Sequence, residues 1–531
     1  MPAPSAPPAM AALIDELLAI LPRDRVISDA NELFVYESDG FTIAKSNPGA
    51  VVFPTTTEEV VRIVQLLNRL DVQIVPRGTG TGLTGGCTAY QNGVVVSVVK
   101  MNKILKIDLE NRVAHVEPGV RNTALSDAVA QLPLNVEVIA DDVHDVKPTT
   151  SPARDPMNGA AGAIQNPQSK IQNLPTPPNP YHFAPDPSSQ RASTIGGNAS
   201  TNAGGIHTLK DFVTSNHILG FEMVLPDGTV LNVGGKDGCY EGGPFDLPGL
   251  ICGHEGTFGI ITKLWVRLVP KARSFRTIVG LFATTADACN TVSEVIAAGM
   301  LPSAMEMLDG RMVEIIEDNY HFGFPKSTQA LVLTEIDGIE PLLDAQRDEI
   351  IAISRRNNAT EVQDSADPAV RAKLWKARKS AFGAIGKISP SYCTQDACVP
   401  RSQLAKVLQR VDEIGKAYGL TITNVFHAGD GNVHPIFCYD DRDEAQVQNV
   451  LLASEEILKY CIDIGGTLTG EHGVGVEKIH LMPYLFDAST MSLFQRVKRA
   501  FDPGERINAG KLLPSDKVVV NLLKPGRHVP Q

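Results

Sequence analysis

The sequence lacks the patterns that hold several common cofactors. Its eight cysteines include no Cys-x-x-Cys pair, and the closest two, Cys393 and Cys398, are five residues apart. This spacing argues against an iron–sulfur cluster or a zinc ribbon within the chain, and reduced cytosolic thiols are expected. The pattern Gly-x-x-x-x-Gly-Lys-Ser/Thr is also absent, which disfavours a nucleotide bound at a P-loop.

Excess positive charge and long apolar runs are missing as well. The formal net charge is -12 at pH 7, and because a nucleic-acid partner requires a basic face, the composition argues against DNA or RNA. A small anionic substrate remains compatible through local arginine. The N-terminal stretch has no basic segment, and Asp15 and Glu16 interrupt its apolar run. We therefore expect neither a signal peptide nor a transmembrane segment, and a cytoplasmic protein.

The chain has the composition of a globular protein, with 43% hydrophobic and 20% charged residues among 531. Strand-like runs alternate with amphipathic helical stretches, which predicts an α+β fold of about two to four domains. We expect a tail and helical segment over 1–47, a first domain over 48–270, a second domain over 271–515 and a tail over 516–531.

A proline-rich segment interrupts the first domain at about 140–182. Ten prolines fall between Pro148 and Pro187, together with many Ser, Asn and Gln residues. Such a segment cannot easily bury apolar area, so we interpret it as an irregular surface excursion. It is either inert or covers part of the active-site mouth or a partner surface.

The stretch "PRGTGTGLTGG", Pro76 to Gly86, contains the letters of a dinucleotide-binding turn, Gly80-x-Gly82-x-x-Gly85. That fingerprint requires a helix after the glycines, whereas a turn and a strand-like run, Val94 to Val99, follow here. The stretch therefore does not predict a nicotinamide site. Its exposed backbone N–H groups could still close on phosphate oxygens, although glycine density alone is also typical of a mobile surface loop.

Two further glycine-rich stretches, Ala192 to Gly205 and Gly253 to Pro270, also adjoin strand-like sequence. Three such turns are harder to explain as connectors than one. Together they predict a binding site for a long ligand with phosphates in its middle.

The segment "TITNVFHAGDGNVHPIFCYD" reads as a β-hairpin with Asp430-Gly431 as a two-residue type I′ turn. In that register His427 and His434 are opposed on one face, close enough to bind one metal ion. Two surface histidines on an ordinary hairpin are the alternative interpretation.

A third ligand is suggested by "GGTLTGEHGVGVEK", in which Glu471 and His472 stand between glycines. Two histidines and one carboxylate leave coordination positions open, as in catalytic metal sites. We expect His427, His434 and Glu471 as ligands of Zn, Mn or Fe, with His472 as a free base. Spacing alone leaves the reverse assignment of Glu471 and His472 open.

Seven motifs occur in an order that resembles a known family: "PRGTGTGLTGG", "APDPSSQ", "STIGGNASTNAGG", "EGTFGI", "WKARKSAFGAIGKISP", "VFHAGDGNVHP" and "GEHGVGVEK". They are similar to the FAD-linked 2-hydroxyacid dehydrogenases of the vanillyl-alcohol oxidase type, which include the flavin subunit of bacterial glycolate oxidase and the D-lactate and D-2-hydroxyglutarate dehydrogenases. The resemblance spans about residues 15–515. It implies a flavin-binding domain of two α+β subdomains, followed by a ferredoxin-like α+β substrate domain.

By motif position, the resemblance implies non-covalently bound FAD and a defined set of flavin-binding residues. They are Arg77, Gly78, Thr79, Gly80, Thr81, Gly82, Gly85, Gly86, Pro185, Asp186, Ser188, Thr194, Gly196, Gly197, Asn198, Asn202, Gly204, Gly205, Glu255, Gly256, Thr257, Gly259, Ile260, Asn508 and Lys511, with Gly510 beside the last two. Two departures stand out, namely Ala509 where the family often has proline, and the proline-rich excursion, which has no counterpart.

The resemblance implies oxidation of a small 2-hydroxyacid. Glycolate or D-lactate is the preferred substrate, and D-2-hydroxyglutarate or a longer D-2-hydroxyacid is the alternative. Arg378 resembles the arginine that pairs with the substrate carboxylate in this family. The alternative interpretation is an exposed charge on a basic helix. In this reaction a bound metal would acidify the hydroxyl group, His472 would take its proton, and FAD would supply the hydride acceptor.

The resemblance also suggests an iron–sulfur partner subunit that leads to membrane quinone and would hold the protein at the inner face of the membrane. A homo-oligomer is compatible with the sequence. Two other classes stay open. A metal-dependent hydrolase would use the same histidines and glutamate but has no need of three glycine loops, and a flavin subunit without catalysis of its own would not need Arg378 and His472.

Overall fold

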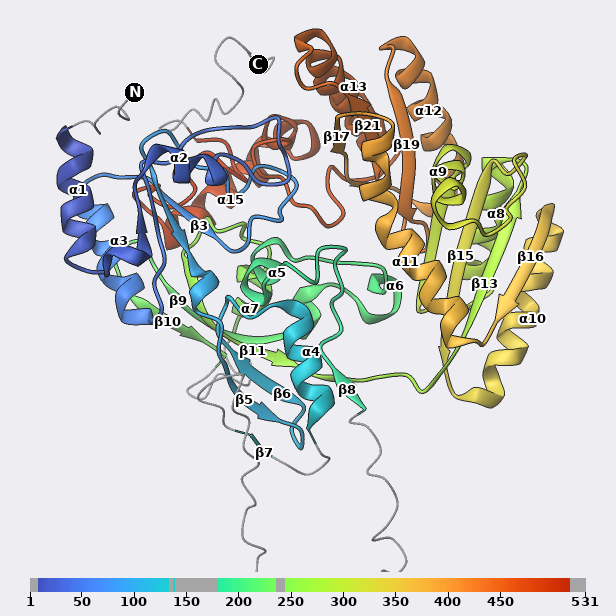
Figure 1. The fold of residues 1–531 in the computed structure, drawn as a ribbon, viewed down its shortest axis with the longest axis horizontal. Helices are drawn as coiled ribbons and strands as arrows, with labels where there is room; N and C mark the ends of the chain where they lie inside the picture. The colour runs from blue at the N-terminus through green and yellow to red at the C-terminus, as the bar shows by residue number, and fades with distance from the viewer. Residues whose placement is uncertain (1–7, 133–136, 139–179, 235–243, 516–531) are drawn as a thin grey trace, which may run out of the picture.

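The computed structural model describes residues 8–132, 137–138, 180–234 and 244–515, and three main β-sheets follow one another along this part of the chain. The proline-rich segment lies mostly outside the described residues, as do both ends of the chain. Figure 1 shows the blue N-terminal sheet on the left and the yellow and orange third sheet on the right, with the second sheet below and between them.

The first sheet combines parallel and antiparallel pairing in the order β1-β2-β4-β3, in which β4 is parallel to both β2 and β3. Its strands and the helices beside it are β1 (Val26–Ile27), β2 (Ala50–Val52), β3 (Ile74–Arg77), β4 (Val94–Ser97), α1 (Pro8–Leu18), α2 (Ala30–Leu33) and α3 (Thr57–Arg69). Helix α3 begins after Thr56, whose side chain accepts a hydrogen bond from the N–H of Glu59. Apolar residues of α1 and α3, Leu17 and Ile63 among them, pack together in the core over this sheet.

The second sheet is antiparallel, in the order β10-β9-β11-β6-β5-β7. Its strands are β5 (Ile104–Asp108), β6 (Val113–Val116), β7 (Glu137–Val138), β9 (Ile218–Val224), β10 (Val230–Val233) and β11 (Ile260–Arg267), and its helices are α4 (Asn122–Gln131), α5 (Ile195–Thr201), α6 (Thr208–Asp211) and α7 (Leu247–Ile251). A tight turn joins β9 and β10, with Gly228 at a φ of 87°. A short pair, β8 (Tyr181–His182) and β12 (Val269–Pro270), completes this part.

The third sheet has nine strands and antiparallel pairing in the order β16-β13-β15-β14-β19-β20-β18, with β17 and β21 joined through β19. The strands are β13 (Ser274–Phe282), β14 (Ala304–Asp309), β15 (Ala330–Gly338), β16 (Ala359–Ser365), β17 (Ser391–Thr394), β18 (Ala397–Cys398), β19 (Thr421–His427), β20 (Asn432–Val433) and β21 (Pro435–Tyr439). The helices are α8 (Thr285–Ala297), α9 (Gly310–Tyr320), α10 (Glu340–Arg356), α11 (Pro368–Ala384), α12 (Leu404–Ala417) and α13 (Glu444–Asp463).

Alternation along the strands of the third sheet gives it two buried faces. Met305 and Met307 of β14 pack in a core with α8, α10, α12 and α13, whereas Ala304 and Leu308 pack in a second core with α9 and α11. Because both faces are covered, the sheet forms a helix–sheet–helix layer, and a polar side chain in the middle of β14 must be buried.

The chain then returns to the first sheet. After α14 (Met482–Leu485) and α15 (Ala488–Phe501), Ile507 forms a parallel bridge with Ile74 of β3. The N–H of Asn508 donates to the carbonyl of Ile74, so the C-terminal segment lies beside the first glycine-rich loop. Across the described residues, no helix is both long enough and apolar enough to cross a membrane.

Candidate active site

The histidine hairpin forms in a different register from the one its sequence predicts. His427 pairs with Asn432, so residues 428–431 make a four-residue loop, and Asp430-Gly431 is not a two-residue turn. The carboxylate of Asp430 accepts the N–H of Asn432, and the N–H of Gly429 donates to Met305 of β14, so contacts beyond the hairpin favour the wider loop.

The error in register did not change which residues share a face. Because side chains alternate with period two, a shift of two residues keeps His427 and His434 on the same side. They become diagonal neighbours instead of directly opposed ones, with ring centroids 5.2 Å apart. Their expected proximity is therefore found in the structure.

The three predicted metal ligands converge on one point. Oε1 of Glu471 lies 3.2 Å from Nε2 of His427 and 3.3 Å from Nε2 of His434. Nδ1 of His427 faces Oε1 of Glu306 at 2.6 Å, and Nδ1 of His434 faces the carbonyl of Gln395 at 3.2 Å. With hydrogen on both Nδ1 atoms, both Nε2 lone pairs point toward the Glu471 oxygen.

Three converging acceptors need a cation among them, either a proton on an imidazole or a metal ion. Burial alone would lower the pKa of His427, but the carboxylates of Glu306 and Glu471 outweigh it and hold that pKa well above its usual value. Two imidazoles and one carboxylate with an open side toward a cavity are a set that could also hold a divalent metal.

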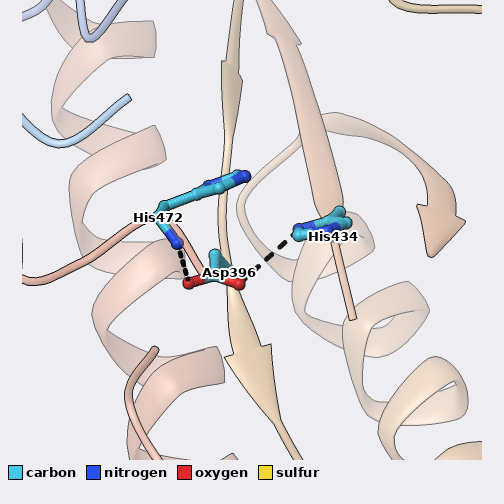
Figure 2. A group of neighbouring side chains, drawn as sticks. All are labelled: Asp396, His434 and His472. Atoms are coloured by element: carbon cyan, nitrogen blue, oxygen red, sulfur yellow. Dashed lines mark hydrogen bonds and ion pairs between the residues drawn. The ribbon is translucent and has the colours of Figure 1, made fainter. Parts of the chain in front are cut away.

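Asp396 fixes the loop that carries Glu471 and His472 (Figure 2). Its carboxylate accepts hydrogen bonds from the three consecutive backbone N–H groups of Gly470, Glu471 and His472. It also accepts from three side chains, those of Asn432, Thr469 and Lys478. Lys478 and Asp396 are both fully buried. Asp396, His434 and His472 also lie close enough to hold a metal, but the oxygens of Asp396 are already engaged, which indicates a support for the loop.

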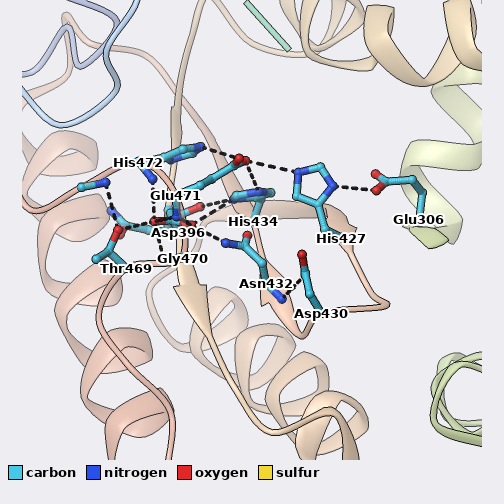
Figure 3. A network of polar contacts seen from close by, with 12 residues as sticks. Glu306, Asp396, His427, Asp430, Asn432, His434, Thr469, Gly470, Glu471 and His472 are labelled. Atoms are coloured by element: carbon cyan, nitrogen blue, oxygen red, sulfur yellow. Dashed lines mark hydrogen bonds and ion pairs between the residues drawn. The ribbon is translucent and has the colours of Figure 1, made fainter. Parts of the chain in front are cut away.

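His472 lies flat against His434, with ring centroids 4.8 Å apart and an angle of 10° between the planes. Its Nε2 is 3.9 Å from Oε1 of Glu471, on the side of the converging ligands, as Figure 3 shows. Burial lowers the pKa of His472 to about 4, although Asp396 opposes this effect. The structure therefore places an imidazole beside the three candidate ligands without making it a fourth member of their cluster.

Arg378 on α11 is buried, with 2% of its surface exposed, and is not an exposed charge on a basic helix. Its Nε donates to Oε2 of Glu306 at 2.7 Å, and its Nη2 contacts the same oxygen. Its Nη1 has no hydrogen-bond partner, and the residue lines the same cavity as the two histidines. A buried guanidinium nitrogen left unpaired at a cavity is suited to an anionic ligand.

A cavity of about 400 Å³ connects this cluster with the three glycine-rich stretches. The predicted flavin-binding residues that line it are Arg77, Gly78, Thr79, Gly80, Thr81, Gly82, Gly86, Ser188, Thr194, Gly196, Gly197, Asn198, Glu255, Gly256, Gly259 and Ile260. Oγ of Ser193 and Nδ2 of Asn198 are buried at the cavity without hydrogen-bond partners, as expected of a site that receives a polar ligand such as FAD.

The other predicted flavin-binding residues do not line this cavity: Gly85, Pro185, Asp186, Asn202, Gly204, Gly205, Thr257, Asn508 and Lys511. Several of them have structural partners. The amide of Asn508 donates to the carbonyls of Gly86 and Glu255, and Nζ of Lys511 donates to those of Gly86 and Thr88. Burial lowers the pKa of Lys511 to about 7. These two side chains therefore tie the C-terminal segment to the first glycine-rich loop.

Glu255 joins two parts of the site. Its carboxylate accepts the N–H groups of Val474 and Gly475, each at 2.7 Å. Gly473, between this contact and His472, has a φ of 90°, and a Cβ there would lie 2.5 Å from the Glu255 carboxylate. The glycine is thus required for the close approach of the two loops.

Sequence reasoning missed Glu306 and Asp396. Glu306 is an acidic residue in the middle of the mostly apolar strand β14, and its burial between Arg378 and His427 depends on segments more than 70 residues away. Asp396 lies between β17 and β18 without a motif of its own. The only local signal was an acidic residue where strand alternation predicts an apolar one, as at Glu306.

Comparisons with known proteins agree with this geometry. Residues 271–512 match the family model of the C-terminal domain of FAD-linked oxidases, and residues 48–140 and 178–234 match that of a FAD-binding domain. Glycolate oxidase subunit GlcD of Escherichia coli K12 is 34% identical over 93% of this chain and 89% of its own length, and that of Bacillus subtilis is 34% identical over 92% and 94%. A D-lactate dehydrogenase of Archaeoglobus fulgidus is 30% identical over 87% and 91%.

Solved structures show the same fold at lower identity. p-Cresol methylhydroxylase with bound substrate superposes with a TM-score of 0.73 at 17% identity, covering 97% of this chain and 99% of that one. 4-Ethylphenol oxidase from Gulosibacter chungangensis gives 0.71 at 19%, covering 98% and 100%. The vanillyl-alcohol oxidase type of flavin-binding fold, predicted from the sequence, is confirmed. The chain belongs to the FAD-linked oxidases and is a flavin-dependent oxidoreductase.

Proposed function

We propose that this protein oxidises a small 2-hydroxyacid, glycolate or D-lactate, to the corresponding 2-oxoacid. The observation that carries the proposal is the unpaired Nη1 of buried Arg378, in one cavity with the glycine-rich loops and the cluster of His427, His434 and Glu471. The names of the relatives, glycolate oxidase subunit and D-lactate dehydrogenase, support the same substrate class.

Each side chain has one task in this proposal. Arg378 binds the substrate carboxylate through Nη1. His427, His434 and Glu471 hold a divalent metal (Zn, Mn or Fe), and His472 accepts the hydroxyl proton at Nε2, the ring nitrogen on the side of Glu471. When bound, FAD supplies the hydride acceptor and the metal supplies a Lewis acid that acidifies the hydroxyl group.

A second cation in the cavity bears on substrate size. Lys379 adjoins Arg378 in sequence and lines the cavity, but its Nζ is 3.9 Å from the carboxylate of Asp186. A dicarboxylate such as 2-hydroxyglutarate would need a second cation. Lys379 shares the carboxylate of Asp186 with His207, so this contact by itself does not select a monocarboxylate.

The first test is anaerobic mixing of the flavin-loaded protein with D-, L- and achiral 2-hydroxyacids, including D-2-hydroxyglutarate, while visible flavin absorbance is followed. Rapid bleaching by glycolate or D-lactate is expected, with loss after treatment with a chelator and recovery on addition of metal. A yellow protein that no hydroxyacid bleaches would contradict the proposal and favour a flavin subunit without catalysis. A colourless protein, which contains no flavin, would favour the alternative of a metal-dependent hydrolase.

Arg378 allows a sharper test with a matched control. Arg378→Met should lower kcat/KM by about 10- to 100-fold, mainly through KM, because it removes a charge-assisted hydrogen bond to the substrate. Arg371→Met, on the same helix but paired with Glu335, should leave KM unchanged. Equal effects of the two variants would rule out a specific role of Arg378 in binding.

We propose further that an iron–sulfur or quinone-linked partner accepts the electrons and holds the protein at the membrane surface. The description of two relatives as subunits supports a partner. If reduced flavin is reoxidised by air as fast as by a membrane fraction from the source cells, this part of the proposal fails.

A further inference from the structure

A single buried carboxylate joins the two halves of the candidate active site. Glu306 lies in the middle of β14 and is fully buried. Its Oε2 accepts the Nε–H of Arg378 at 2.7 Å, and its Oε1 faces Nδ1 of His427 at 2.6 Å. Figure 3 shows the second contact, with the His427 ring between Glu306 and Glu471.

These two contacts determine how each partner faces the cavity. On Arg378, Glu306 occupies Nε and contacts Nη2, so that Nη1 is the nitrogen left without a partner. On His427, the contact keeps hydrogen on Nδ1 and leaves Nε2 facing Glu471. The same carboxylate therefore orients a group that binds substrate and a group that binds metal.

We propose that Glu306 is a positioning residue that couples carboxylate binding at Arg378 to metal binding at His427. This inference deepens the proposed function, since it takes the roles of Arg378 and His427 from it. An anion on Nη1 offsets part of the guanidinium charge and weakens the hold of Arg378 on Glu306. Glu306 then accepts more strongly from Nδ1–H of His427, which makes Nε2 a better metal ligand.

Thermodynamic linkage makes the effect reciprocal, since each ligand must change the affinity of the other by the same factor. In the holoprotein, acetate is therefore expected to raise the affinity for Zn²⁺ by several-fold, and Zn²⁺ to raise the affinity for acetate equally. Acetate is the probe because it has a carboxylate but no hydroxyl group to be oxidised.

The experiment measures Zn²⁺ affinity of the flavin-loaded protein by chelator competition, with and without acetate. Glu306→Gln should bind Zn²⁺ about 10- to 100-fold more weakly, because it removes the carboxylate that orients a metal-binding histidine. In this variant acetate should no longer change the affinity. Glu306→Asp, which keeps the charge on a shorter side chain, should recover part of both effects and serves if the amide variant does not fold.

The matched control is Glu335→Gln. Glu335 lies on the neighbouring strand β15, is also buried, and binds Arg371 and Trp375 of the same helix α11, but it contacts none of the three candidate metal ligands. The Glu335→Gln variant should leave both the Zn²⁺ affinity and its response to acetate unchanged. A second variant, Arg378→Met, removes the cation that competes with His427 for Glu306. It should therefore bind Zn²⁺ at least as tightly as the wild type does with acetate, and it should lose the response to acetate.

Three outcomes would overturn the inference. One is an unchanged Zn²⁺ affinity in Glu306→Gln, another is an equal loss in Glu335→Gln, and the third is a response to acetate that persists in Arg378→Met. The test is separable from the proposed function. If acetate and Zn²⁺ binding are coupled but no hydroxyacid is oxidised, the role of Glu306 stands and the proposed substrate class is rejected. If a hydroxyacid is oxidised but the two affinities are not coupled, only the role of Glu306 is rejected.

Discussion

At the scale of single residues, the candidate site consists of side chains held by contacts with neighbouring protein groups. His472 is stacked on His434, and its backbone N–H is bound by Asp396. Its ring therefore has little freedom to move away from Glu471. In the proposed role of a base, His472 would therefore contribute to catalysis through its position.

His472→Asn should lower the rate of flavin reduction by about 10²–10⁴, because it removes the proton acceptor but keeps a polar side chain of similar size. Flavin content and substrate affinity should stay close to those of the wild type. Stopped-flow measurement under anaerobic conditions checks the rate, and His480→Asn, outside the cavity lining, serves as control. Reduction at a nearly normal rate would exclude His472 as the base.

A single methyl group offers a second test at this scale. A Cβ at Gly204 would lie 2.7 Å from Oε2 of Glu471 and 2.8 Å from the hydroxyl of Thr208. Gly204→Ala should therefore displace the Glu471 carboxylate and weaken metal binding by about tenfold while the protein stays folded. Gly383→Ala, where a Cβ meets no atom within 4 Å, is the control in the same titration. Unchanged metal affinity in Gly204→Ala would argue against Glu471 as a ligand.

At the scale of elements, the site depends on the short segment between β17 and β18. Asp396 in this segment pairs with Lys478, and the two are buried together beneath the loop of Glu471 and His472. A buried ion pair contributes little net stability by itself, but removal of one partner leaves an uncompensated charge. A substitution of either Asp396 or Lys478 alone is therefore expected to cost more stability than the intact pair contributes.

Asp396→Asn should lower the free energy of unfolding by roughly 3–5 kcal/mol, because the Lys478 ammonium would remain buried without its counter-charge. The double variant with Lys478→Met should recover part of this loss. Chemical unfolding followed by circular dichroism measures both. If the single variant is as stable as the wild type, the pair does not anchor the loop.

At the scale of the whole molecule, one polar chain joins the flavin-binding part to the third sheet. His207 faces Asp186 through Nδ1 at 2.9 Å and Glu335 of β15 through Nε2 at 3.6 Å. Burial alone would lower the pKa of His207, but the two carboxylates outweigh it and raise that pKa to about 10. The imidazolium is therefore the form that holds these parts together.

This contact predicts a pH-dependent stability. Because the pKa of His207 is higher in the folded state, its contribution is fully present below about pH 6.5, the ordinary pKa of histidine, and is lost as the pH rises through about 10. His207→Asn should therefore unfold at a lower temperature than the wild type at pH 7, and the difference should shrink toward pH 10. His321→Asn, at an exposed position after α9, is the control. A difference independent of pH would show that the charge of His207 does not stabilise the fold.

The sequence by itself determined the features that depend on nearby residues or on chemical identity. The Thr56 cap, the turn at Gly228 and the strand after the first glycine-rich loop follow from local conformational preference. The three glycine-rich stretches predicted a site for a long ligand with phosphates, and the family resemblance implied that this ligand is FAD. The set of two histidines and a glutamate predicted a metal site, which stays a prediction. His427 and His434 were also placed on one face, since period-two alternation tolerates a register shift of two.

Only the tertiary structure decided the hairpin register, the direction of Arg378 and the supports beneath the site. The wider loop at 428–431 is held by Met305 of a neighbouring strand, and Glu306 and Asp396 gain their partners from segments far away in the chain. Such contacts form when sheets and helices pack, and a buried carboxylate keeps its charge only where that packing supplies donors to it. No local pattern encodes that condition, so these residues became visible only in the folded molecule.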